Sequence, residues 1–188
     1  MDYLTYCGIS IKIEQDEDPR NPREDSDPLG KMICFHGRYD LGDKHEYRHE
    51  DYNGWDAMKA AIQKQEDAAI ILPLYLYDHS GITMRTTPFT CPWDSGQVGF
   101  IFVSKEKARE EYGRLTKKTI EKITKYLIDE VAEYDTYLTG DVWGYIVDKG
   151  SENEQSCWGH FGYDYCVEEA KREAYFIAKK LCSPSIYG

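Results

Sequence analysis

Residues 68–104 read "AAIILPLYLYDHSGITMRTTPFTCPWDSGQVGFIFVS", and this stretch decides the fold of the chain. Its first part, Ala68–Asp78, is a continuous apolar run that is too short for a buried helix and contains Pro73, which predicts a central strand with a bulge. A hairpin turn through Asp78–Gly81 leads into a second strand, and Gln97–Ser104 predicts a third. The stretch therefore predicts the centre of a mostly antiparallel sheet.

The turns of this stretch carry residue types that could also build a pocket. His79 lies in the first turn, and Cys91, Trp93 and Asp94 lie in the second. Asp and Gly favour turns and Pro fixes a backbone angle, so a purely structural role explains both segments. Two such turns at one end of a sheet are also where a small-ligand pocket would form.

The remaining segments complete an α+β pattern. Apolar and aromatic runs predict strands over residues 3–14, 31–37, 141–149 and 156–162. Helical spacing of apolar residues predicts helices over residues 55–65, 104–113, 120–138 and 163–182. We expect one domain, residues 1–188, with a mixed, mostly antiparallel sheet, three to four helices packed on it, and a mobile acidic loop over about residues 15–29.

The charge of the chain limits its partners. Its 34 acidic and 23 basic residues give a net charge of -11 and a pI near 4.9. This field repels nucleic acid and membrane phosphates and attracts basic protein surfaces, so we expect neither direct nucleic-acid binding nor membrane binding. No signal sequence is visible and the six cysteines form no CxxC pair, which predicts a cytoplasmic protein with reduced thiols.

Residues 45–49 read "HEYRH" and match the H-E-x-x-H pattern of zinc metalloproteases. That pattern requires a helix with an apolar face for docking, whereas the flanking residues are polar turn-formers and only Tyr47 is apolar. We expect a polar loop at this position, with no metal and no cofactor.

Cys91 offers an alternative, enzymatic interpretation. A thiolate nucleophile requires a lowered pKa and a base within reach. Cys91 precedes Pro92 rather than a helix N-terminus, so the usual local means of lowering a thiol pKa is absent. The residues of this alternative site, for an enzyme or a small-ligand-binding protein, are Cys91, His79 and Asp94, with His36, His160 and Asp78 as further candidates.

Three segments carry a resemblance to a known group of proteins. They are "LPLYLYDHSGITMRTTPFTCPWDSGQVGFIFVSKEKAREEYG" (residues 72–113), "EVAEYDTYLTGDVWGYIV" (130–147) and "SCWGHFG" (156–162). Over these segments the chain resembles a family of small, uncharacterised proteins of bacteriophages and mobile elements. The family supplies no reaction and no catalytic residues to transfer.

The resemblance implies a setting in which small acidic proteins inhibit bacterial defence, including anti-CRISPR proteins that present carboxylates to a DNA-binding groove. We therefore expect a non-catalytic DNA mimic that acts in the host cytoplasm and binds a CRISPR nuclease or a similar effector. Such a groove is rich in Lys and Arg, and spaced carboxylates can compete for it. The candidate partner-binding residues are Asp16, Glu17, Asp18, Glu24, Asp25 and Asp27 in the loop and Asp129, Glu130, Glu133 and Asp135 in the long helix.

Overall fold

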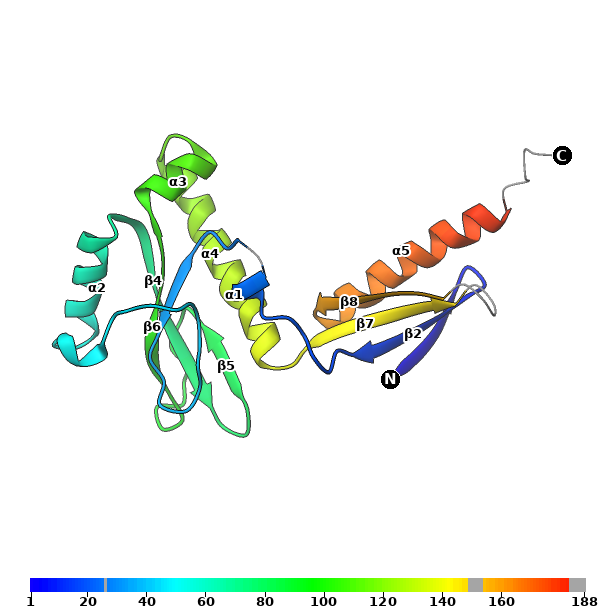
Figure 1. Ribbon diagram of the computed structural model, residues 1–188, viewed down its shortest axis with the longest axis horizontal. Coiled ribbons are helices and arrows are strands. Elements are labelled where there is room, and N and C mark those ends of the chain that lie inside the picture. The colour runs from blue at the N-terminus through cyan, green and yellow to red at the C-terminus, as the bar shows by residue number, and fades with distance from the viewer. Residues whose placement is uncertain (26, 149–153, 183–188) are drawn as a thin grey trace. The chain divides into compact units, whose positions relative to one another are not determined.

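Residue contacts divide the chain into two units, each with its own hydrophobic core (Figure 1). The structure is a computed structural model that describes residues 1–25, 27–148 and 154–182. The central unit is Asn21–Thr139, and the terminal unit combines Met1–Arg20 with residues 140–188. These two compact units both lie within residues 1–188, for which we expected one domain.

The sheet of the central unit has four antiparallel strands. Strand β4 (Ala68–Asp78) lies between β6 (Ser95–Ser104) and β5 (Ile82–Arg85), and β3 (Lys31–Cys34) pairs with the other side of β6. The predicted interior position of the 68–78 strand is confirmed, and its register shifts twice along β6. The hairpin predicted through residues 78–81 joins β4 to β5.

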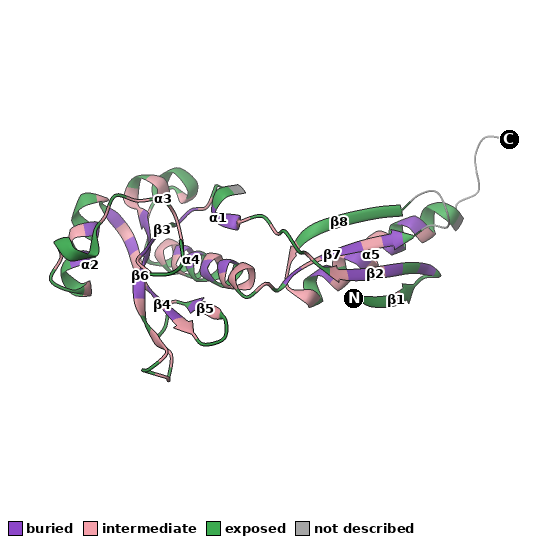
Figure 2. Cartoon of the chain, turned by 60° about the horizontal axis from the view of Figure 1, so that its bottom comes forward, coloured by how far each residue is buried: buried purple, intermediate pink, exposed green. Residues whose placement is uncertain are grey.

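Helices cover both faces of this sheet, which explains why the interior strand β6 is apolar and buried from Val98 to Val103. On β6, Phe100 and Phe102 belong to the cluster packed with α2 (Trp55–Gln65). The intervening Ile101 and Val103 belong to the cluster packed with α4 (Lys117–Leu138). Because successive side chains of a strand point to opposite faces, a strand buried on both faces loses the polar alternation. Figure 2 shows β6 as a largely buried strand of this sheet.

The helices of the central unit begin and end where local signals place them. Ser104 caps α3 (Lys105–Tyr112), and its hydroxyl accepts the Lys107 N–H at 3.1 Å. Gly113 ends α3 with a φ of 71°, a conformation that favours glycine. Two short helices were not predicted, α1 (Pro22–Asp25) within the acidic loop and η1 (His49–Asp51).

The terminal unit is a four-stranded antiparallel sheet with one helix on it. The strand order is β1 (Asp2–Tyr6), β2 (Ile9–Gln15), β7 (Val142–Asp148) and β8 (Glu154–Phe161). Helix α5 (Tyr163–Cys182) covers the face formed by the isoleucines of β2, because Ile9, Ile11 and Ile13 share a core with Ala170 and Ala174. No helix among the described residues is long and apolar enough to cross a membrane.

The α+β class is confirmed, but two details of the expected fold are wrong. The expected strand over residues 3–14 is a hairpin, β1–β2, which turns at Cys7 and Gly8 with φ values of 51° and 77°. β-branched and aromatic residues, which favour strands, lie on both sides of this turn and concealed it. The expected single mixed sheet is two separate sheets, and every strand pair in them is antiparallel.

Gly99 allows β6 and β3 to approach each other closely. A Cβ atom at Gly99 would overlap the carbonyl oxygen of Ile33, whereas a Cβ at Gly96, in the same strand, would meet nothing within 4 Å. We expect Gly99→Ala to lower the free energy of unfolding by about 1–3 kcal/mol, because backbone atoms must move to accept the methyl group.

Urea denaturation of the two variants measures this difference, with Gly96→Ala as the matched control. Equal transition midpoints for Gly99→Ala and Gly96→Ala would show that the β3–β6 contact is looser than described.

Candidate functional site

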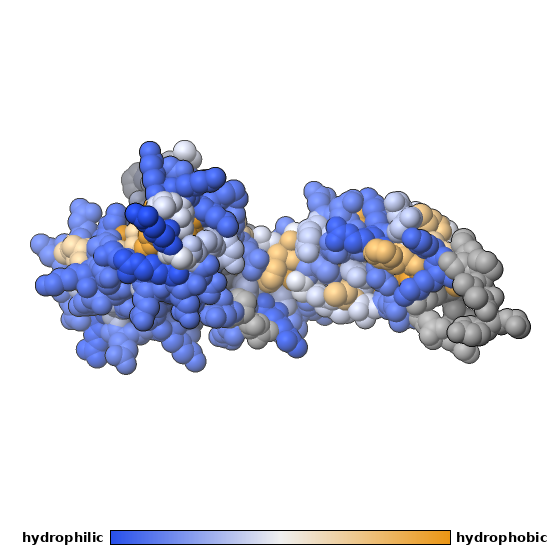
Figure 3. Space-filling model, turned by 90° about the horizontal axis from the view of Figure 1, so that it is seen from above, coloured by the Kyte–Doolittle hydropathy of each residue, from blue (hydrophilic) through white to orange (hydrophobic). Residues whose placement is uncertain are grey.

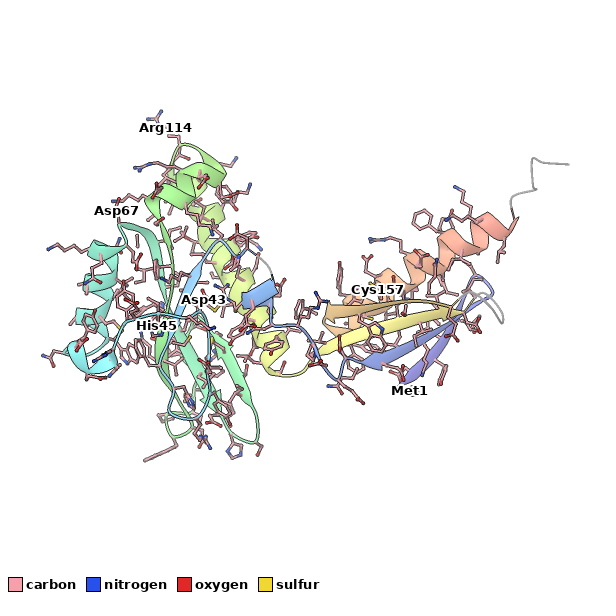
Figure 4. The ribbon with its side chains drawn as sticks, viewed as in Figure 1. Met1, Asp43, His45, Asp67, Arg114 and Cys157 are labelled. Carbon is pink, nitrogen blue, oxygen red and sulfur yellow. The ribbon has the colours of Figure 1, made fainter. Side chains whose placement is uncertain are left out.

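A buried arginine organises the acidic side of the central unit. The Arg23 side chain is 3% exposed and forms a two-pronged ion pair with Asp43, with Nε–Oδ1 2.9 Å and Nη2–Oδ2 2.6 Å. Its Nη1 donates to Glu130 Oε2 at 3.2 Å. Figure 4 labels Asp43, one of the two carboxylates that Arg23 binds. We call these three residues the Arg23 network; it ties α1 to α4.

Glu130 and Asp43 also satisfy backbone groups of the chain that leads into β3. Glu130 accepts the N–H of Leu29 at 2.7 Å and the N–H of Gly30 at 3.1 Å, and Asp43 accepts the N–H of Met32 at 2.7 Å. Burial raises the pKa of the Glu130 carboxyl, although the Leu29 N–H and the Arg23 charge act in the opposite direction. Glu130 is therefore a structural residue rather than a free surface acid.

An acidic hollow of about 210 Å³ lies beside the Arg23 network, between α1 and α4. We call it the α1–α4 hollow. It brings together one candidate acid of the predicted loop and three of the long helix. Its lining residues are Pro22, Arg23, Asp27, Pro28, Tyr126, Asp129, Glu130 and Glu133.

Glu130 is paired with the buried Arg23, whereas the other acids of the α1–α4 hollow have only exposed partners among the described residues. Asp27 pairs with Lys107 at 3.3 Å and Asp129 pairs with Lys125 at 2.6 Å, and both pairs are solvent-exposed. Exposed pairs contribute about 0–1 kcal/mol, so another cation can replace either lysine at little cost. Glu133 is exposed on α4. The hollow can therefore accept basic side chains from a partner.

The ten candidate acids are divided between the two units. Asp16, Glu17 and Asp18 belong to the terminal unit, whereas the other candidates belong to the central unit. Asp135 accepts the N–H of Met84 at 2.6 Å and so holds β5 against α4. Glu24 is exposed on α1, and the side chain of Asp25 lies outside the described residues. Figure 3 shows one face of the molecule, on which hydrophilic residues predominate.

The three residues of the alternative enzymatic site, Cys91, His79 and Asp94, are neighbours in the structure. Their arrangement does not activate the thiol. The Cys91 Sγ lies 3.5 Å from Asp94 Oδ2, and the His79 Nδ1 lies 3.7 Å from the same oxygen. The carboxylate therefore stands between the thiol and the imidazole. A nucleophilic cysteine requires the imidazole beside the sulfur and the acid behind the imidazole, whereas an adjacent carboxylate repels a thiolate.

The other histidines proposed as bases have different neighbours. His36 Nε2 lies 3.8 Å from Asp78, which also binds Arg38, and the His36 ring stacks on Tyr39. His160 belongs to the terminal unit and stacks on Tyr145. Burial lowers the pKa of His160. These histidines pack against aromatic rings, and nothing in their contacts points to a reaction.

The "HEYRH" motif lies in an irregular segment whose last residue, His49, begins η1, and it is not in an α-helix. His45 Nε2–H donates to the Cys34 carbonyl at 3.0 Å, and the His49 ring meets Trp55 edge-on at 4.8 Å. Over the described ranges, 1–25, 27–148 and 154–182, no three His, Cys, Asp or Glu side chains are grouped to hold a metal ion. Both histidines contribute to packing around α2.

No family model, no curated protein and no solved structure matches the chain. The resemblance to bacteriophage and mobile-element proteins remains a prediction.

Sequence reasoning missed Arg23, although one signal was available. Arg20 and Arg23 are the two bases among six acids in residues 15–29. A base kept within an acidic, proline-rich segment is a sign of an internal ion pair, because charged side chains are buried only when they are paired.

Removing the Arg23 guanidinium should destabilise the central unit. We expect Arg23→Met to lower the free energy of unfolding by about 3–5 kcal/mol at pH 8, because two carboxylates lose their shared cation. The difference in unfolding free energy between Arg23→Met and the unchanged protein should be smaller at about pH 5. The pKa of Glu130 is already raised by burial, and protonation removes a charge that no longer has a partner.

Thermal unfolding at both pH values tests this expectation. Arg114→Met, at an exposed arginine that Figure 4 labels, is the matched control. A deficit that stayed constant with pH would contradict an electrostatic cause.

Proposed function

We propose that this protein is a non-catalytic inhibitor of bacterial defence, carried by a bacteriophage or mobile element, which binds the basic groove of a nucleic-acid-handling effector such as a CRISPR nuclease. The observation that supports this proposal best is the α1–α4 hollow, where Asp27, Asp129 and Glu133 lie on one rigid frame. Carboxylates at fixed positions can occupy sites that otherwise neutralise phosphates.

Rigidity is what makes the hollow suitable for binding. The Arg23 network fixes α1 and the chain after it against α4, and Lys107 donates to the Pro28 carbonyl at 2.8 Å. The backbone that carries the acids therefore loses little conformational entropy when a partner binds, which favours affinity without a large buried area. Tyr126, which is 47% exposed at the edge of the hollow, adds an aromatic contact of the kind enriched in protein interfaces.

The enzymatic alternative receives less support. Its residues Cys91, His79 and Asp94 are neighbours, but the carboxylate occupies the position that an activating imidazole would need. We therefore place the function in binding rather than in thiol chemistry.

Capture of purified, guide-loaded CRISPR nucleases by the immobilised full chain tests the proposal. We expect one nuclease of a panel to be retained at about 0.1 M salt and less at about 0.5 M, because salt screens surface charge. The double variant Asp129→Lys/Glu133→Lys should weaken this capture roughly tenfold or more, because it places like charges opposite a basic groove.

The control is Glu110→Lys/Glu111→Lys, two exposed acids of α3 whose reversal changes the net charge equally. Equal losses in the two double variants would show that net charge acts without a specific site. Retention of no nuclease at either salt concentration would refute the proposed partner class.

A further inference from the structure

An exposed tryptophan and an acidic turn lie together on the terminal unit. Trp158 of β8 is 45% exposed and lines a pocket of about 500 Å³ with the residues that end β2. Met1, labelled in Figure 4, also lines this pocket. The described residues that line this pocket include four acids and no Lys, Arg or His. They are Met1, Glu14, Gln15, Asp16, Glu17, Asp18 and Trp158, and we call them the Trp158 pocket.

A glycine holds the indole against the sheet. Gly144 of β7 lies opposite Glu14 of β2, and a Cβ atom on Gly144 would overlap ring carbons of Trp158. The ring therefore occupies the space left by the missing side chain, which places it beside Glu14. One part of the indole is packed on the backbone, and the rest remains open to solvent.

The acidic turn is fastened beside this ring. The Asp16 N–H donates to the Val142 carbonyl at 2.8 Å, and Asp16 Oδ2 accepts the N–H of Gly159, the residue after Trp158, at 3.2 Å. Asp16 Oδ1 accepts the N–H of Asp18 at 3.1 Å. The turn and the ring come from separate strands, and these bonds fix their relative position.

The remaining charge in the pocket is negative. Glu14 pairs with Lys12 at 2.8 Å, which offsets one acid. Asp16 is used in positioning the turn, while Glu17 and Asp18 are exposed. An aromatic face attracts cations through its electron-rich ring, and neighbouring carboxylates add to that attraction.

We infer that the Trp158 pocket binds an arginine side chain of a basic protein partner. A planar guanidinium can stack on the indole while its N–H groups donate to the carboxylates of the turn, which the compact ammonium of lysine cannot do equally well. Phosphate groups would be repelled by the same acids. The inference rests on the proposed function only in taking a basic protein as the partner, and it concerns a different unit of the chain.

The test is an NMR titration of the full chain with the peptide Ac-Gly-Arg-Arg-Gly-NH2, following the backbone amide of Gly159. We expect a saturable shift, a Kd at least threefold weaker for the Lys-Lys peptide, and no shift for the Glu-Glu peptide. Trp158→Leu should weaken binding of the arginine peptide about three- to tenfold, through loss of the cation–π contact.

Two matched controls make the result specific. Trp93→Leu removes a tryptophan that is 91% exposed on the central unit and should leave the Kd unchanged. Glu17→Gln/Asp18→Asn should weaken binding, whereas Glu110→Gln/Glu111→Gln, which removes equal charge from α3, should not. The inference is overturned if the arginine peptide does not shift Gly159, or if Trp158→Leu and Trp93→Leu bind it equally well.

The titration and the nuclease capture can fail separately. Asp129→Lys/Glu133→Lys should retain the peptide response at Gly159, because the changed residues belong to the other unit. A normal titration with no captured nuclease would therefore refute the proposed function and support the Trp158 pocket. Capture of a nuclease without a peptide response would support the proposed function and refute the Trp158 pocket as an arginine site.

Discussion

The buried guanidinium of Arg23 is the constraint on which the acidic side of the central unit depends. A charge removed from water requires partners, and Asp43 and Glu130 supply them from two different parts of the chain. Both carboxylates also accept backbone N–H groups near the start of β3. One network therefore pairs the buried cation with two carboxylates and supplies hydrogen-bond acceptors for backbone N–H groups of the connecting chain. As a consequence, Asp27 lies beside α4.

This arrangement separates acids that hold the fold from acids that can meet a partner. Glu130 and Asp135 are used internally, by Arg23 and by the N–H of Met84. Asp129 and Glu133 occupy the same helix but face solvent. Helical spacing alone does not distinguish the internal acids from the solvent-facing acids, because both kinds include residues next to the buried apolar residues of α4. The distinction comes from the segments that pack against α4, and it reduces the number of acids to which a binding role can be assigned.

The elements that can be predicted from the sequence are those with local signals, such as apolar spacing, a helix cap or a closing glycine. The helices over residues 55–65 and 163–182 follow from apolar spacing, and the helix after Ser104 follows from a cap and a closing glycine. The two-sheet arrangement depends on pairing of distant strands, which no local pattern contains. The Arg23 network and the Trp158 pocket are likewise made by residues far apart in sequence, so their geometry appears only in the folded chain.

The central unit interrupts the sequence of the terminal unit. Strand β2 pairs with β7 although the whole central unit lies between them, and the Gln15 side chain reaches the Gly140 carbonyl at 2.7 Å, so the chain leaves and returns at one place. A ribosome makes β1 and β2 before the central unit, and the three isoleucines of β2 have no cover until β7 and α5 emerge. The central unit has every strand of its sheet within one continuous segment and can fold earlier. Its folding also shortens the loop that β2 and β7 must close, so β1 and β2 are made before the central unit but are buried after it.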